Sequence, residues 1–99
     1  MDSDYKLMKA YLRAIDINSM KKICRMAELT EDQIVLITMY YGEGKTEDFI
    51  ADYLGMSLNA YHNARMDQVH KIMHFLRLTR PEESSFQECI NEIERRLRW

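Results

Sequence analysis

Residues 29–78, LTEDQIVLITMYYGEGKTEDFIADYLGMSLNAYHNARMDQVHKIMHFLRL, decide the fold of this chain. Short polar joints divide the stretch into three segments in which apolar residues recur at helical spacing. Thr46 and Ser57 each supply a side-chain oxygen that can cap a helix N-terminus. Between them, Gly55 can take the left-handed conformation that ends a helix. The pattern predicts a short helix, a tight turn and a longer helix, which together form a helix-turn-helix.

The rest of the chain adds helices on both sides of this stretch. Thr30 with Gln33 forms a capping box that opens the first helix of the stretch, and Ser85 with Glu88 forms another that opens the last helix of the chain. The sequence therefore predicts one all-α domain over residues 1–99. Its parts are N-terminal helices in residues 1–28, a core in residues 29–79 and a C-terminal amphipathic helix in residues 84–99. Six helices are expected, near residues 3–15, 19–28, 30–41, 46–54, 58–79 and 84–99.

The composition is that of a compact globular protein, with 46% apolar residues and one proline. No apolar run approaches the roughly 20 residues of a membrane span, and the N-terminus lacks the apolar segment of a secretory signal. We therefore expect a cytoplasmic protein with no membrane partner. Cys24 and Cys89 fit no metal-ligand spacing and are interpreted as reduced, partly buried thiols.

The charge is distributed unevenly along the chain, although the net charge is only −2. Residues 29–56 contain one basic and six acidic side chains. Residues 57–80 contain four basic and one acidic side chain and all three histidines. Residues 1–28 contain six basic and four acidic side chains. The pattern places positive charge on the second helix of the helix-turn-helix and on the N-terminal segment, and predicts a basic face on an acidic body.

A series of short motifs runs through the core in a fixed order. They are Leu29-Thr30-Glu31, Tyr41-Gly42-Glu43-Gly44, Thr46-Glu47-Asp48, Ile50-Ala51 and Leu54-Gly55-Met56-Ser57, followed by the long helix. In this order, without insertion over about half of the chain, they resemble region four of bacterial sigma factors, the promoter-reading C-terminal domain. They are also similar to small sigma-like regulators of phages and mobile elements.

The resemblance implies that the helix from Leu58 enters the DNA major groove and that the helix before it lies across the groove. Physical reasons agree, because an α-helix fits this groove, Asn can bind adenine through two hydrogen bonds, and Leu can contact a thymine methyl group. Phosphates can bind at helix N-termini. Tyr61 and Val69 are expected in the core. The predicted DNA-binding residues are Thr46, Ser57, Leu58, Asn59, His62, Asn63, Arg65, Met66 and Lys71.

We therefore expect a DNA-binding transcriptional regulator that acts on duplex DNA without catalysis. Because sigma-like domains contact RNA polymerase, the resemblance implies polymerase as a further partner. An apolar stripe in the last helix either seals the domain or pairs two subunits, and we favour a homodimer. The stripe consists of Phe86, Ile90, Ile93 and Leu97.

Alternative functions follow from other features. The acidic residues 29–56, together with Phe49, expected to be exposed on its helix, favour a phage-encoded inhibitor or adaptor that uses the sigma-like surface on a host protein. The DNA-recognition part of a phage packaging protein is another alternative. An enzyme is not expected, because the sequence contains no Gly-rich phosphate loop and no nucleophile–base spacing. His70 and His74 lack a third metal ligand, so we expect no metal, cofactor or small-molecule substrate.

Overall fold

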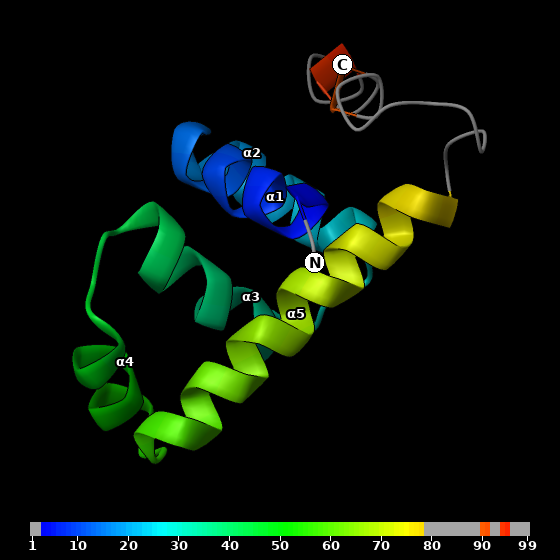
Figure 1. The fold of residues 1–99 in the computed structure, drawn as a ribbon. Coiled ribbons are helices and arrows are strands. Elements are labelled where there is room, and N and C mark those ends of the chain that lie inside the picture. The colour runs from blue at the N-terminus through cyan, green and yellow to red at the C-terminus, as the bar shows by residue number, and fades with distance from the viewer. Residues whose placement is uncertain (1–2, 79–89, 92–93, 96–99) are drawn as a thin grey trace.

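The computed structural model describes residues 3–78, 90–91 and 94–95, and this part of the chain contains helices but no strand. The all-α class predicted from the sequence is therefore confirmed. The predicted helix over residues 84–99 lies mostly outside the described residues, of which 90–91 and 94–95 are helical. The elements are α1 (Ser3–Ala14), α2 (Ile17–Met26), α3 (Glu31–Ile37), the π-helical turn η1 (Thr38–Gly42), α4 (Glu47–Leu54) and α5 (Leu58–Leu78) (Figure 1).

Local capping explains where the early helices begin. Asp16 accepts a hydrogen bond from the Ser19 backbone N–H at 3.2 Å, so α2 begins at Ile17, two residues before the predicted start. The predicted capping box of α3 is present. The Gln33 N–H donates to Thr30 Oγ1 at 3.2 Å, and the Thr30 N–H donates to the Gln33 side chain at 3.0 Å.

The end of the third helix differs from the regular helix that the sequence predicts. From Thr38 the backbone widens into a π-helical turn, and the Glu43 N–H donates to the Thr38 carbonyl at 2.9 Å. Such turns are uncommon and occur often at functional sites. Within this turn the rings of Tyr40 and Tyr41, neighbours in sequence, contact each other edge to face with centroids 4.9 Å apart.

The joint between α4 and α5 has the geometry that its residues predict. Thr46 Oγ1 accepts from the Phe49 N–H at 3.1 Å, and Ser57 Oγ accepts from the Ala60 N–H at 3.1 Å. Gly55 has a φ of 70°, and its N–H donates to the Asp52 carbonyl at 3.1 Å. This left-handed end of α4 reverses the chain within a few residues and brings α5 against α4.

Most of the buried apolar side chains form one cluster, here named the main core. It lies between α1, α2, α3 with η1, and the middle and later turns of α5, the long diagonal helix in Figure 1. Ile34 and Ile37 bring the apolar side of α3 into this core. The main core consists of Met8, Leu12, Met20, Ile23, Cys24, Ala27, Leu29, Ile34, Ile37, Tyr41, Val69, Ile72 and Met73.

A second, smaller cluster lies between α4, the start of α5 and the junction of α3 with η1. This small core consists of Leu36, Met39, Ile50, Ala51 and Tyr61. The Tyr61 hydroxyl donates to the Leu36 carbonyl at 2.9 Å, which provides the partner that a buried hydroxyl requires. The predicted burial of Tyr61 and Val69 is confirmed.

Three other predictions are partly covered by the described residues. Cys24 is a free, buried thiol, and burial raises its pKa to about 12, whereas Cys89 lies outside the described residues. Of the C-terminal apolar stripe only Ile90 is described, and it is buried. The predicted homodimer therefore stays a prediction. No helix in the described part of the chain is both long and apolar enough to cross a membrane.

Candidate nucleic-acid interface

The first two turns of α5 present a polar, accessible face. Asn59 and Asn63 are both exposed and lie one turn apart on the same side of the helix. His62 and Met66 are half-buried beside them, and Leu58 is exposed at the helix start. The structure therefore brings together most of the base-reading residues that the resemblance implies.

Arg65 is not part of this accessible face, and its predicted role as a DNA contact needs correction. The residue is only 4% exposed, and its guanidinium points back between α4 and η1. Lys71, by contrast, is exposed farther along α5. A guanidinium that is buried and already paired has no charge to offer to a phosphate at the surface.

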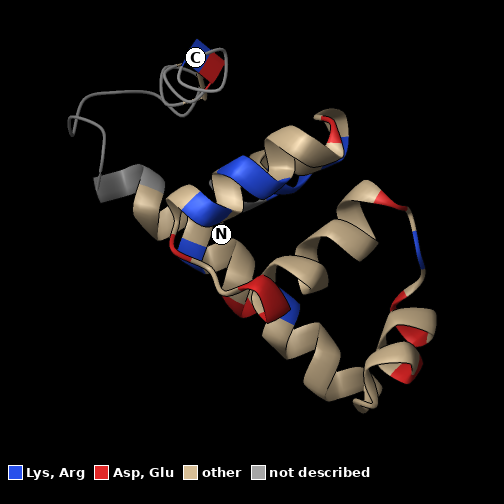
Figure 2. Ribbon diagram, turned by 180° about the vertical axis from the view of Figure 1, so that it is seen from behind, with Lys and Arg blue, Asp and Glu red and all other residues tan. Residues whose placement is uncertain are grey.

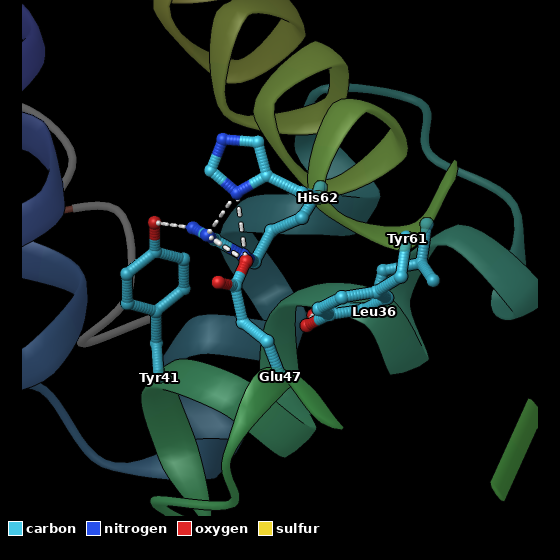
Figure 3. A network of polar contacts seen from close by, with 6 residues as sticks. Leu36, Tyr41, Glu47, Tyr61 and His62 are labelled. Carbon is cyan, nitrogen blue, oxygen red and sulfur yellow. Dashed lines mark hydrogen bonds and ion pairs between the residues drawn. The ribbon is translucent and has the colours of Figure 1, made fainter. Parts of the chain in front are cut away.

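Arg65 instead forms a polar network with residues of α4 and η1, and Figure 3 shows Tyr41, Glu47 and His62 of this network. Its Nη2 donates to Glu47 Oε2 at 2.6 Å, and its Nη1 donates to the Tyr41 hydroxyl at 2.7 Å. The guanidinium carbon lies 4.0 Å from the centre of the Tyr40 ring, at cation–π distance. The network therefore joins the first residue of α4 to α5 and to both tyrosines of η1.

The hydrogen bonds of this network favour the charged forms of Glu47 and Arg65. Burial would by itself raise the pKa of Glu47, but the hydrogen bonds from Arg65 and His62 outweigh it and hold that pKa below its usual value. Burial would likewise lower the pKa of Arg65, and the hydrogen bond to Glu47 reverses this, so that the pKa is raised. Both Glu47 and the buried Arg65 are therefore charged at neutral pH.

His62 is held in a defined orientation by the same carboxylate. Its Nδ1 lies 2.8 Å from Glu47 Oε2. Because an ionised carboxylate can only accept a hydrogen bond, Nδ1 is the donor of this contact. The side chain is 45% exposed. His62 is therefore held by Glu47 while part of its ring is accessible at the surface.

Thr46 and Ser57 act through the helix starts. Both side-chain oxygens accept backbone N–H groups of their own helices, as described above. Their contribution to the interface is to fix the two N-termini, whose remaining N–H groups carry partial positive charge. Neither hydroxyl needs to contact DNA directly for this role.

The face carries little exposed positive charge. Figure 2 shows acidic residues on α4, while Lys and Arg occur on α1 and α2. On α4 the acidic residues are Glu47, Asp48 and Asp52, and α1 and α2 contain Lys6, Lys9, Arg13, Lys21, Lys22 and Arg25. The expected basic face on the second helix is thus reduced by the burial of Arg65.

The sequence did not reveal the partners of Arg65. Glu47 directly follows a helix cap, where an acidic residue is common because it interacts favourably with the helix dipole. That local explanation hides its pairing with a residue 18 positions later. Tyr40 and Tyr41 lie at the end of the helix expected over residues 30–41, and only the π-helical turn shows why both contact the same guanidinium.

Comparison of the chain with models of protein families, with curated proteins and with solved structures gives no match. Within the described residues, no three His, Cys, Asp or Glu side chains converge on a point where a metal ion could bind. Function is therefore inferred from the geometry of the α4–α5 face.

Proposed function

We propose that the chain is a DNA-binding transcriptional regulator that reads duplex DNA with α5, using α4 and α5 as a helix-turn-helix. The observation that carries this proposal is the accessible row of Asn59, His62 and Asn63 at the start of a long helix that follows a tight Gly55 turn. In this arrangement a helix N-terminus can enter the major groove, and its first side chains can reach base edges.

The chemistry of the row fits base reading. Asn59 and Asn63 can each bind the N6 and N7 edge of an adenine, and Leu58 can pack against a thymine methyl group. His62 is oriented by Glu47, which lowers the entropy lost when it binds. A site that is rich in adenine and thymine is the expected target.

The small amount of exposed positive charge on the α4–α5 face limits the expected affinity for DNA. Phosphate contacts supply most of the sequence-independent affinity, so a single copy is expected to bind weakly at physiological salt. A homodimer would read two half-sites and bind more tightly. Contact with RNA polymerase, as the sigma-like motifs imply, would recruit or block polymerase in the cytoplasm.

Selection of bound sequences from a random duplex pool, followed by fluorescence anisotropy, tests the proposal. Asn59→Ala with Asn63→Ala is expected to lose at least about tenfold in affinity for the selected site, because each bidentate pair contributes about 1–3 kcal/mol. Asn18→Ala, an exposed asparagine on α2, is the matched control. Absence of binding by the wild type even at about 50 mM salt would contradict the proposal.

A second candidate is an interaction protein, an inhibitor or adaptor that contacts a host protein. The specific observation is a stacked pair of exposed aromatic rings on α4, Phe49 and Tyr53, which are 50% and 69% exposed with centroids 6.3 Å apart. They border a hollow of about 460 Å³ between α2, α3 and α4. Exposed apolar side chains of this size beside a hollow are typical of protein contacts.

Affinity capture from a nuclease-treated bacterial lysate tests this candidate. A stoichiometric partner that the wild type retains and that Phe49→Ser with Tyr53→Ser loses would support it. The same partner retained by both proteins would exclude the aromatic pair as the contact. The Asn59→Ala, Asn63→Ala variant serves as the control, because its substitutions lie on α5.

A further inference from the structure

A hollow of about 470 Å³ opens beside the start of α5, and it shares Lys45 with the hollow that Phe49 and Tyr53 border. One side chain reaches it from α1, several belong to the linker and the first turn of α4, and one is the first residue of α5. It is lined by Arg13, Tyr40, Gly44, Lys45, Thr46, Glu47, Asp48 and Leu58. The hollow is therefore continuous with the predicted base-reading face through Leu58.

Two cations from different parts of the chain line this hollow. Arg13 and Lys45 are both exposed, and within the described part of the chain neither forms an ion pair. Each lies at cation–π distance from an aromatic ring, and the ring beside Lys45 belongs to the other hollow, whose lining Lys45 shares. The Arg13 guanidinium lies 5.5 Å from the centre of the Tyr41 ring, and Lys45 Nζ lies 5.2 Å from the centre of the Phe49 ring.

The acidic residues of the hollow do not cancel this charge. Glu47 is already paired with the Arg65 guanidinium at 2.6 Å. Asp48 is exposed and remains the opposing charge. Two unpaired cations therefore face one unpaired carboxylate, and the first turn of α4 adds a partial positive charge.

We propose that this hollow binds the phosphate backbone of duplex DNA, with Arg13 and Lys45 each contacting one phosphate. The inference rests on the proposed DNA-binding function and names the residues that supply its electrostatic part. A duplex that meets Leu58 and Asn59 with its bases must place backbone near the hollow, because the same residue, Leu58, borders both. Since Arg65 is buried, α1 and the linker provide cations that the start of α5 does not.

The test is fluorescence anisotropy with a fluorescein-labelled, random-sequence duplex, measured from about 50 to about 200 mM salt. The slope of log affinity against log salt is expected to be less negative by about 2 in the double variant Arg13→Gln with Lys45→Gln. Each lost phosphate contact removes about 0.9 from the magnitude of the slope. The control, Lys22→Gln with Arg25→Gln on α2, removes the same charge and should keep the slope of the wild type.

Asp48→Asn provides an effect of opposite sign. Removal of the unpaired carboxylate is expected to tighten binding several-fold at about 50 mM salt, with the difference shrinking as salt rises. If Arg13→Gln disturbs folding, as judged by circular dichroism, Lys45→Gln alone still tests the site. Lys45 lies in the exposed linker, and its single variant should reduce the slope by about 0.9.

The outcomes separate this inference from the proposed function. If the wild type binds DNA and the double variant has the same slope as the α2 control, the phosphate site is wrong while DNA binding stands. If the wild type binds no duplex at low salt, the proposed function and the phosphate site both fail. If the slope becomes shallower in the Arg13 and Lys45 variants and not in the α2 control, the phosphate site is supported.

Discussion

The main core and the small core hold their helices together in different ways. Among the described residues, the main core buries thirteen side chains from α1, α2, α3, η1, α5 and the segment between α2 and α3. The small core of the same part of the chain buries only five, and the neighbouring Arg65–Glu47 pair joins α4 to α5. The difference indicates that global stability comes from the main core, whereas the Arg65 network positions the face proposed to read DNA.

Large-to-small substitutions are the strongest way to test this comparison. Ile72→Ala in the main core is expected to lower the free energy of unfolding by about 2–5 kcal/mol, because the surrounding helices cannot collapse into the cavity. Ile50→Ala in the small core should cost less, because the short helix α4 can shift toward the space. Both isoleucines are fully buried, so they form a matched pair. Urea denaturation measures both values, and equal losses would contradict the comparison.

Removal of the Arg65 charge tests the network itself. Arg65→Met keeps an unbranched side chain but removes the hydrogen bonds of the guanidinium to the carboxylate of Glu47 and the hydroxyl of Tyr41. We expect a loss of about 1–3 kcal/mol in the free energy of unfolding. Combining Arg65→Met with Glu47→Gln should restore part of that loss, because no uncompensated charge remains. Simple additivity of the two single losses would contradict coupling between the residues.

The pH dependence of stability is a second test of the Arg65–Glu47 pair, and the expected change in the free energy of unfolding is smaller. The pKa of Glu47 is lower in the folded chain than in the unfolded chain, so its contribution is present above the unfolded pKa and is lost as the pH falls. The stability difference between wild type and Glu47→Gln should be about 1 kcal/mol at pH 7 and shrink between about pH 5 and pH 3. A difference that is constant over this range would contradict the role of the ionised carboxylate.

His62→Gln is the control for this pH series. It removes the histidine from the network and leaves the Arg65–Glu47 pair, so an acid transition that persists in this background does not arise from His62. Thermal unfolding followed by circular dichroism across the same pH range compares the three proteins under one protocol.

The ends of α2 and α4 both have a residue with positive φ, and substitutions there are expected to change stability least. Gly55 ends α4 with a φ of 70°, whereas Glu28, after α2, has a φ of 64°. A residue with a side chain is strained in this left-handed conformation. Glu28→Gly should therefore raise the free energy of unfolding by about 0.5–1 kcal/mol, and Gly55→Ala should lower it by about 1 kcal/mol. Changes of the same sign in the two variants would contradict this account.

Much of the fold could be predicted because its signals act over short distances. The capping box of Thr30 and Gln33, the cap at Thr46 and the end of α4 at Gly55 each involve hydrogen bonds between residues no more than a few positions apart. The candidate site was predictable in part for the same reason. Asn59 and Asn63 are exposed because they lie on the side of α5 opposite Tyr61 and Val69.

The sequence by itself determined an all-helical chain, the start and end of most helices, and the burial of residues such as Tyr61. Only the tertiary structure decided that Arg65 is buried, that η1 widens into a π-helical turn, and that Arg13 reaches the start of α5. The physical reason is the separation along the sequence over which each interaction acts. Caps and apolar periodicity depend on neighbours within one or two turns, whereas the partner of a charged side chain depends on which helices pack together. Glu47 and Tyr41 meet Arg65 because α4 and η1 fold against α5.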